Sequence, residues 1–289
     1  MKKQIIHIGG NKTGSTLLQR KLFPKLKDFT FLNFEENKSK ALKEVIRSLI
    51  FQDDYEYNKH KLFLKNFTKN KNIIFSSEDI IAERFITIIA KRLKVCFPNG
   101  KVLFVIRNQI TAFNSWFVSH GSYLKNVPKN YWKRYVDLKD WSDFCFNYPY
   151  QGPISALNYY KIFTIFSKIF GKSRIKVLLY EDLQENPNFF FDKLSHTLGI
   201  DNSFTEKMLS DKRERVSRTK LEYQLHSIFH NYDLSSTIYR FIKNFGIESK
   251  KGPFILTNSI EKRVIDYFSK LNHKLSKEIN INLKERGYP

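Results

Sequence analysis

The stretch Ile5-Ile6-His7-Ile8-Gly9-Gly10-Asn11-Lys12-Thr13-Gly14-Ser15-Thr16 decides the fold of this chain. Its apolar beginning predicts a buried strand that runs directly into a glycine-rich turn. A helix is expected to start at Ser15 or Thr16, with three leucines in its first two turns and Pro24 at its end. Glycines let the main chain approach a ligand closely, and the first N–H groups of a helix have no partners within it. This arrangement is typical of a cradle for an anion, usually a phosphate.

The turn resembles a Walker A loop in its glycine spacing but differs from it in its lysine. Gly9 and Gly14 are separated by four residues, as that motif requires, yet Ser15 follows where the motif has lysine. The lysine stands two residues before the second glycine instead, at Lys12. A glycine turn between a strand and a helix also occurs without any ligand. Because the strand-to-helix context, Lys12 and the hydroxyl residues coincide here, we interpret the loop as a phosphate-type site that does not plainly suit ATP with magnesium.

Composition describes an ordinary globular protein. The chain has 289 residues, of which 42% are hydrophobic and 27% charged, enough for one sizeable core or two small ones. No apolar run reaches transmembrane length, and no secretory segment is visible. Only two cysteines occur, Cys96 and Cys145, so neither a disulfide framework nor a cysteine metal site is expected. We expect a cytoplasmic protein, with peripheral contact at the inner membrane face as a further option.

The formal net charge of +22 suggests a negatively charged partner. Nucleic acid, an anionic membrane surface and a polyanionic substrate are the three classes to weigh against a merely solvated basic surface. The lysines are scattered, and neither zinc ligands nor an aromatic RNA-binding signature accompanies them. We therefore expect no nucleic-acid partner and keep the other two classes open.

Strands and helices are expected to alternate through the first two thirds of the chain. Strands are predicted at residues 5–8, 29–34, 72–75, 101–106 and 174–180. Helices are predicted at residues 41–51, 80–95, 110–120, 153–171 and 182–198, with a helix or irregular cover at 53–70. The alternation predicts an α/β fold with a parallel, doubly wound sheet and right-handed crossovers.

The remaining segments complete the expected domain organisation. Residues 121–152 are aromatic and basic and are interpreted as irregular. Two long helical pieces are predicted at residues 221–245 and 259–283. The simplest account is a single domain over residues 1–289, in which an α/β core (1–203) carries a helical C-terminal extension (204–289).

Four candidate site residues follow predicted strands directly. They are Lys12 in the first loop, Glu78, Arg107 and Glu181. In doubly wound sheets, ligands bind at the carboxyl ends of the strands, so this is where a site is expected.

In these positions the chain resembles the sulfotransferases that use 3′-phosphoadenosine-5′-phosphosulfate (PAPS). That family has a loop of the type Lys-[Ser/Thr]-Gly-[Ser/Thr]-Thr after its first strand, and Lys12-Thr13-Gly14-Ser15-Thr16 matches it. A strand that ends in arginine, followed eight residues later by serine, is matched by Arg107 and Ser115. A looser match is the segment 177–183 with Pro187 and a later Leu-Gly. The resemblance spans about residues 4–200 and is closest to the bacterial and carbohydrate-directed branch.

The resemblance implies how PAPS would bind. The loop of Lys12, Thr13, Gly14, Ser15 and Thr16 would take the phosphosulfate, while Arg107 and Ser115 would take the 3′-phosphate. Lys12 would also neutralise the charge that grows on the leaving oxygen, and no metal is then required. In the family a late loop closes over the nucleotide, and Ser217-Arg218-Thr219 loosely resembles it, although the family's glycine is missing.

The resemblance also implies a general base near the second central strand. Glu78 occupies the place where related enzymes carry a catalytic glutamate or histidine. An alternative role for Glu78 is in the cap or first turn of the helix that follows, because Ser76, Ser77 and Asp79 also suit a cap. Asp79 and His120 are the fallback bases.

The acceptor is expected to be a hydroxyl, or an amine, of a glycan, a glycolipid or a related lipid-linked molecule. The aromatic residues 121–152 are the predicted acceptor wall. Two alternatives stay open: a P-loop kinase that uses ATP, and a basic protein that binds polyanions or membranes without catalysis. Three further polar residues are interpreted as structural: His7, Glu181 and Asp182.

Overall fold

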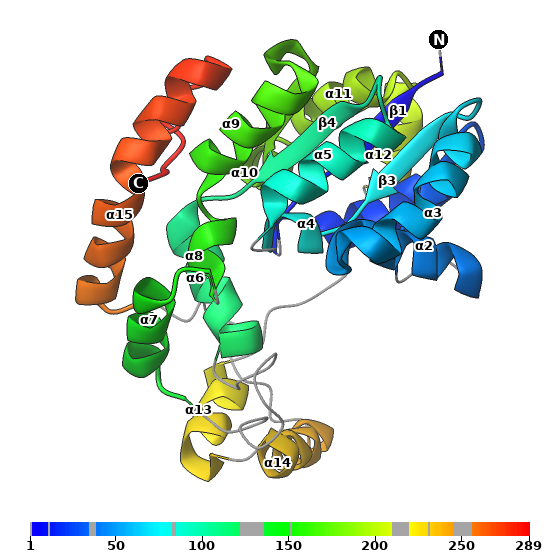
Figure 1. Ribbon diagram of the computed structural model, residues 1–289. Helices are drawn as coiled ribbons and strands as arrows, with labels where there is room; N and C mark the ends of the chain where they lie inside the picture. Colours follow the sequence, from blue (N-terminus) through cyan, green and yellow to red (C-terminus); the bar gives the residue numbers. More distant parts are fainter. Residues whose placement is uncertain are drawn as a thin grey trace.

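The computed structural model describes residues 2–10, 12–34, 39–82, 85–121, 136–150, 152–209, 220–230, 232–245 and 256–289. Its centre is a five-stranded sheet in which every neighbouring pair is parallel (Figure 1). The strands are β1 (Gln4–His7), β2 (Thr30–Leu32), β3 (Ile73–Ser76), β4 (Lys101–Ile106) and β5 (Ile175–Leu179). Their order across the sheet is β2-β3-β1-β4-β5. The predicted parallel α/β architecture is confirmed.

The central strands carry runs of apolar residues because both faces of the sheet are covered. Successive side chains of a strand point to opposite faces. In β4, Val102 and Phe104 enter one hydrophobic core, and Leu103 and Val105 enter the other. All four side chains are fully buried. This division into two cores is what makes the sheet doubly wound, as predicted.

Helices from distant parts of the chain cover each face. The larger core is covered by α2 (Lys40–Phe51), α3 (Asp54–Thr68), α5 (Ile86–Cys96), α6 (Gln109–Trp116), α9 (Tyr159–Phe170) and α15 (Asn258–Ile279). The smaller core is covered by α1 (Ser15–Leu17), which continues as the π-helical η1 (Leu18–Leu22) and the 3-10 turn η2 (Phe23–Lys25), and by α11 (Pro187–Leu198) and α12 (Asn202–Leu209). Pro24 lies in η2, where the first helix was expected to end.

Four helices predicted as single pieces are each divided in two. The expected helix 80–95 is α4 (Asp79–Ala82) followed by α5, and the expected helix 153–171 is α8 (Pro153–Ala156) followed by α9. The expected helix 221–245 is α13 (Lys220–Phe229) followed by α14 (Tyr232–Asn244). The expected helix 182–198 is the end of α10 (Tyr180–Glu185) followed by α11. Local capping explains the second break, because the Asn158 side chain accepts a hydrogen bond from Lys161 N over 3.0 Å and starts α9. A left-handed residue, His230, ends α13.

The prediction that residues 121–152 are irregular is wrong for α7 (Leu138–Asn147). The Asp137 carboxylate begins this helix by accepting from Asp140 N over 2.8 Å. Trp141 packs between Phe113 and Phe117, with ring centroids 4.6 and 5.3 Å away. Trp141 of α7 therefore belongs to the core. Residues 122–135 and 151 lie outside the described residues.

Short elements connect the rest. They are η3 (Phe117–Gly121), η5 (Lys172–Arg174) and α10 (Tyr180–Glu185). Helices α13 and α14 contact each other and lie apart from the sheet, at the bottom of Figure 1. Within the described ranges, no helix has the length and apolar character needed to span a membrane.

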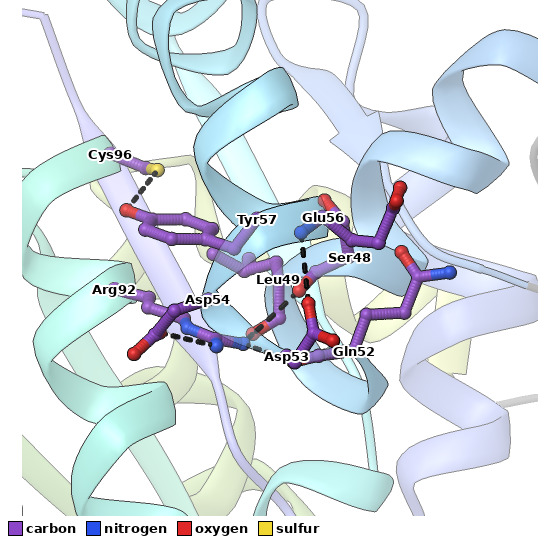
Figure 2. A network of polar contacts seen from close by, with 9 residues as sticks. All are labelled: Ser48, Leu49, Gln52, Asp53, Asp54, Glu56, Tyr57, Arg92 and Cys96. Atoms are coloured by element: carbon purple, nitrogen blue, oxygen red, sulfur yellow. Dashed lines mark hydrogen bonds and ion pairs between the residues drawn. The ribbon is translucent and has the colours of Figure 1, made fainter.

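A buried arginine ties three helices together at the β2 side of the sheet. The guanidinium of Arg92 in α5 donates to the main-chain carbonyls of Ser48 and Gln52 over 3.1 and 2.8 Å, at the end of α2 (Figure 2). It also pairs with Asp54 in α3 over 2.7 Å. The last carbonyls of a helix lack partners within it, and here Arg92 satisfies them.

Candidate active site

The loop between β1 and α1 is held by its own hydroxyl groups. Thr13 Oγ1 donates to the carbonyl of Gly10 over 2.6 Å and lies 3.2 Å from Ser15 Oγ. Ser15 Oγ donates to the same carbonyl over 3.3 Å. Both side chains are buried. These two hydroxyls of the predicted motif therefore fix the main-chain path of the loop by bonding to the Gly10 carbonyl beneath it.

Gly9 lies where no side chain fits. A Cβ at this position would stand 2.6 Å from both His7 Nε2 and Ser15 Oγ, far inside van der Waals contact. Gly10 is nearly as confined, since its Cβ would lie 3.0 Å from Ile81 Cδ1 in α4. The main chain thus comes close to its neighbours at the floor of the loop, as expected of a cradle.

The chain turns through the left-handed region at the mouth of the loop. Gly14 has φ of +80° and forms the N-cap of α1, where no side chain caps the helix. Lys12 also has a positive φ, +71°. The other two described non-glycine residues with positive φ, His230 and Asn280, lie at helix ends. Such a conformation is uncommon for lysine and is concentrated at functional sites.

Arg107 reaches from the end of β4 to this loop. Its Nη1 donates to the main-chain carbonyl of Lys12 over 2.9 Å, and its Nε donates to Thr111 Oγ1 over 3.0 Å. A guanidinium carries five N–H donors, so these two bonds fix its plane and leave three donors for other acceptors. The structure thus brings together Lys12 and Arg107, two of the predicted site residues.

Two tyrosines hold Arg107 from outside its own segment. The Tyr180 ring lies under the guanidinium, 4.8 Å from its carbon, and also contacts Gly14, where a Cβ would be 3.3 Å away. The buried Tyr159 hydroxyl donates to the Arg107 carbonyl over 2.9 Å. Sequence reasoning missed both residues in this role, because they are contributed by α10 and α9, far along the chain.

Ser115 lies on α6, half-buried, four residues after Thr111. Residues four apart lie on the same face of a helix, so Ser115 stands one turn beyond the hydroxyl that accepts from Arg107. Thr111 was not among the predicted residues. The sequence could have indicated this role, because Thr111 lies four residues after Arg107 and four residues before Ser115.

A buried histidine supports the loop from below. His7 Nδ1 lies 2.7 Å from Ser76 Oγ on the neighbouring strand, and Ser76 Oγ accepts from Gln19 Nε2 over 2.9 Å. Complete burial lowers the pKa of His7 to about 3, so the imidazole is neutral at physiological pH. Its ring packs edge-on against Phe23. The expected structural position of His7 is confirmed.

Glu78 lies in the turn between β3 and α4, half-buried, beside the loop. β3 pairs with β1 in register, and Ser77 N donates to the His7 carbonyl over 3.3 Å, so the two strand ends are adjacent. Ile81 of α4 contacts Gly10. The capping contact of α4 comes from Ser77, whose Oγ accepts from Asp79 N over 3.3 Å. The carboxylate of Glu78 therefore lies at the carboxyl ends of the strands, where the candidate site is expected.

The other predicted residues are placed as follows. Asp79 is exposed at the start of α4, and its carboxylate accepts from Ser77 Oγ over 3.2 Å. The backbone of His120 belongs to η3, but its side chain lies outside the described residues, as do Ser217 and Arg218. Thr16 is half-buried in α1. The described chain contains no cluster of three or more histidine, cysteine or acidic residues suited to a metal ion.

Glu181 and Asp182 have protein partners, as expected of structural residues. Glu181 Oε1 accepts from Asn108 N over 2.9 Å. The buried Asp182 carboxylate pairs with Arg286. The first contact ties the start of α10 to the end of β4, and the second ties it to the residues that follow α15.

The fold and the site define a parallel α/β protein in which a strand-end arginine is hydrogen-bonded to a glycine-rich loop at the carboxyl ends of the strands. A family model described as "Sulfotransferase domain" matches residues 2–275. The chain therefore belongs to the sulfotransferase family, and as a member it is a transferase. No curated protein matches the chain at a significant level.

One solved structure supports the fold, and two further sulfotransferase domains align more weakly. The crystal structure of a sulfotransferase from Alicyclobacillus acidocaldarius aligns with a TM-score of 0.58 and 13% identity, over 99% of this chain and 98% of that one. Sulfotransferase domains from the curacin biosynthetic pathway and from the Synechococcus PCC 7002 olefin synthase align with TM-scores of 0.41 and 0.39 and identities of 14% and 13%. They cover 93% and 83% of this chain, and 98% and 96% of their own chains.

Proposed function

We propose that the protein transfers a sulfuryl group from PAPS to a hydroxyl, or an amine, of a glycan, a glycolipid or a related acceptor. The observation that carries the proposal is the hydrogen bond from Arg107 Nη1 to the Lys12 carbonyl, 2.9 Å long. It joins the strand-end arginine to the glycine-rich loop, and together these are the proposed anion-binding surface. PAPS carries a phosphosulfate at one position and a phosphate at another, and such a surface suits both groups.

The residues present fit this nucleotide. The loop Lys12-Thr13-Gly14-Ser15-Thr16 would hold the phosphosulfate, because Gly9 and Gly10 let its main chain pack closely on the residues beneath and no side chain caps α1. Arg107 and Ser115 would hold the 3′-phosphate, the first through its remaining N–H donors and the second through its hydroxyl. Ser217 and Arg218 are proposed as further nucleotide contacts from the late loop.

Lys12 is the residue proposed to act on the bond that breaks. PAPS supplies the sulfuryl group, and negative charge grows on the oxygen that bridges phosphorus and sulfur as this group leaves. An ammonium held at that oxygen stabilises the charge without any reorganisation. Sulfuryl transfer resembles phosphoryl transfer, in which positioning and charge stabilisation carry most of the catalysis. The left-handed backbone at Lys12 is consistent with a side chain aimed for this task.

Glu78 is proposed as the general base that accepts the proton of the acceptor hydroxyl. Its turn adjoins the loop, since Ile81 contacts Gly10 and Ser77 bonds to His7. Asp79 and His120 remain the alternatives for this task.

The acceptor is proposed to be carbohydrate or lipid-linked, with residues 121–152 forming part of its wall. A net charge of +22 favours an acidic acceptor or an anionic membrane face over a neutral one. We place the enzyme in the cytoplasm with peripheral contact at the inner membrane face, and without a nucleic-acid partner. No metal is proposed for catalysis.

Transfer of labelled sulfate from PAPS by the purified protein tests the proposal directly. The wild type should label at least one member of a panel of glycans and glycolipids, and Lys12→Ala should not. Binding of adenosine 3′,5′-bisphosphate, measured by calorimetry, needs no acceptor and decides the question of the nucleotide. If the wild type does not bind this nucleotide, the proposal is wrong.

A matched comparison separates sulfuryl transfer from the kinase alternative. Thermal unfolding is measured with adenosine 3′,5′-bisphosphate and, separately, with ATP plus magnesium. A ligand that binds only the folded state raises the midpoint. We expect the larger shift with adenosine 3′,5′-bisphosphate, whereas a P-loop kinase would show the reverse.

A further inference from the structure

Residues 283–289, called here the C-terminal turn, dock beside the proposed nucleotide site. After α15 the chain turns back, and Leu283 is fully buried in the larger core. Tyr288 N donates to the Leu283 carbonyl over 3.0 Å, which closes the turn. Tyr288 itself is only 3% exposed. The turn is therefore a fixed part of the structure with defined partners.

Those partners are the residues that follow β4 and β5. The Tyr288 hydroxyl donates to Glu181 Oε2 over 2.6 Å, and Asn108 Nδ2 donates to the Gly287 carbonyl. Arg286 pairs with the buried carboxylate of Asp182. Three successive residues of the turn thus contact the two strand ends that flank Arg107.

Glu181 connects the turn to the main chain next to Arg107. One of its carboxylate oxygens accepts from the Tyr288 hydroxyl, and the other accepts from Asn108 N over 2.9 Å. Burial and the neighbouring Glu181 raise the pKa of Tyr288 well above its ordinary value, so the hydroxyl keeps its proton. It therefore donates to Glu181 across the whole physiological range of pH.

Asn108 links the Glu181 contact to Arg107. Its Oδ1 accepts from Ile110 N and Thr111 N over 2.9 and 3.3 Å, which makes it the N-cap of α6. Thr111 in turn accepts from Arg107 Nε over 3.0 Å. A shift of Asn108 would move both the backbone that precedes α6 and the hydroxyl that orients the guanidinium.

We propose that Tyr288 is a positioning residue for the nucleotide's 3′-phosphate, acting through Glu181 and Asn108 on Arg107. The inference rests on the proposed function, because it assigns the 3′-phosphate to Arg107. It adds a residue that lies outside every motif of the resemblance, 181 positions after Arg107 in the sequence. A residue with this role should affect ligands that carry a 3′-phosphate and spare those that lack one.

The test compares two nucleotides that differ only in that phosphate. Dissociation constants for adenosine 3′,5′-bisphosphate and adenosine 5′-monophosphate are measured by calorimetry for the wild type and for Tyr288→Phe. Loss of one hydrogen bond in the chain of contacts should raise the dissociation constant of the bisphosphate by about 3- to 10-fold. Binding of the monophosphate should change by less than about 2-fold, so the preference for the bisphosphate falls.

Tyr57→Phe is the matched control. Tyr57 is similarly buried, and its hydroxyl contacts Cys96 Sγ at 3.9 Å. It belongs to the same core as Tyr288 but lies in α3, which packs against α2 and α5 and not beside Arg107. This variant should keep the wild-type preference, whatever it does to the unfolding midpoint. If Tyr288→Phe lowers the midpoint but leaves the preference for the bisphosphate unchanged, the positioning role is overturned and the residue is merely structural.

Two variants of Glu181 give a second, independent measurement. Glu181→Gln keeps an oxygen that can accept from Asn108 N, whereas Glu181→Ala removes it. The alanine variant should lose more of the preference than the glutamine variant. Equal losses would contradict the proposed chain of contacts. If the wild type itself does not prefer the bisphosphate, the proposed function fails and this inference falls with it, a result distinct from wild-type preference without an effect of Tyr288.

Discussion

The guanidinium of Arg107 donates a hydrogen bond from Nη1 to the main-chain carbonyl of Lys12, joining residues 95 positions apart over 2.9 Å. The bond uses the carbonyl of a lysine whose backbone is left-handed, with φ of +71°. The cation of Arg107 and the loop that carries Lys12 are thereby fixed relative to one another before any ligand binds. Preorganisation of this kind is what catalysis by charge stabilisation requires.

Replacing Arg107 by lysine should weaken nucleotide binding although the net charge is unchanged. A lysine has no planar fork, so it cannot bond Thr111 and the Lys12 carbonyl together and still present paired donors to a phosphate. We expect the dissociation constant of adenosine 3′,5′-bisphosphate to rise by at least about tenfold, by calorimetry.

Arg174→Lys is the control for Arg107→Lys. Arg174 is an arginine that bonds the Pro98 carbonyl over 3.2 Å, near the start of β4 and so at the opposite end of the strand. Arg174→Lys should leave the dissociation constant of adenosine 3′,5′-bisphosphate unchanged. A protein that binds polyanions only through its overall charge would treat both variants alike, and that result would argue for the non-catalytic alternative.

Lys12→Ala should impair the chemical step more than the binding step. If the ammonium stabilises charge that develops only as the sulfuryl group leaves, its removal lowers kcat by about 100- to 1,000-fold. Affinity for adenosine 3′,5′-bisphosphate should change far less, because the main chain of the loop and Arg107 remain. Lys25→Ala, an exposed lysine in η2, should retain wild-type kcat. Equal losses in kcat and in affinity would contradict the assignment.

Glu78→Gln should abolish most of the turnover while leaving nucleotide binding intact. The amide is similar in size but cannot accept a proton, so a loss of about 100-fold or more in kcat is expected of a general base. Asp79→Asn, one residue later and exposed, serves as the matched control and should lose little. The opposite ranking of the two variants would transfer the role of base to Asp79.

Sequence reasoning was sufficient where short-range patterns decide the structure. The apolar run of β4 is readable because both faces of the strand are buried, and the strand-end Arg107 follows from it directly. Helix boundaries were less accurate, because apolar periodicity continues across the break that the Asn158 side chain creates before α9. The Asn158 cap therefore divides a segment whose apolar pattern predicts a single helix.

The supports of the candidate site could not be predicted, because they come from distant parts of the chain. Tyr159 reaches Arg107 across 52 residues, and Tyr288 reaches Glu181 across 107. Neither tyrosine carries a local signal that names its partner. Topology brings these residues together, and only the folded structure shows it.

Arg92→Met should destabilise the fold without affecting the site. The side chain of Arg92 is 7% exposed and satisfies the carbonyls at the end of α2, whereas its partner Asp54 is 76% exposed. Loss of the carbonyl bonds should lower the free energy of unfolding by about 2–4 kcal/mol, by urea denaturation. Asp54→Asn should cost less than about 1 kcal/mol, because an exposed carboxylate is screened by water. A larger effect for Asp54→Asn would show that the ion pair, and not the cap, is the main contribution.

The neutral, buried His7 should make the protein less stable in mild acid. Burial lowers its pKa from 6.5 to about 3, so between these values the unfolded chain binds a proton at this residue and the folded chain does not. The free energy of unfolding therefore rises with pH in this window and falls as the pH drops below 6.5, by up to about 1.4 kcal/mol per pH unit. Above pH 6.5 both states are neutral at His7, and its contribution no longer depends on pH.

A non-titrating replacement isolates this contribution from that of the many carboxylates. His7→Asn can still bond Ser76 Oγ but takes up no proton on unfolding. Urea denaturation of both proteins at pH 7.5 and at about pH 5 gives four free energies of unfolding. Between the two pH values, the wild type should lose about 2 kcal/mol more than His7→Asn, since roughly 1.5 pH units of the window are crossed. Parallel losses in the two proteins would mean that the imidazole titrates alike in the folded and unfolded states, and that a proton reaches it beneath the loop.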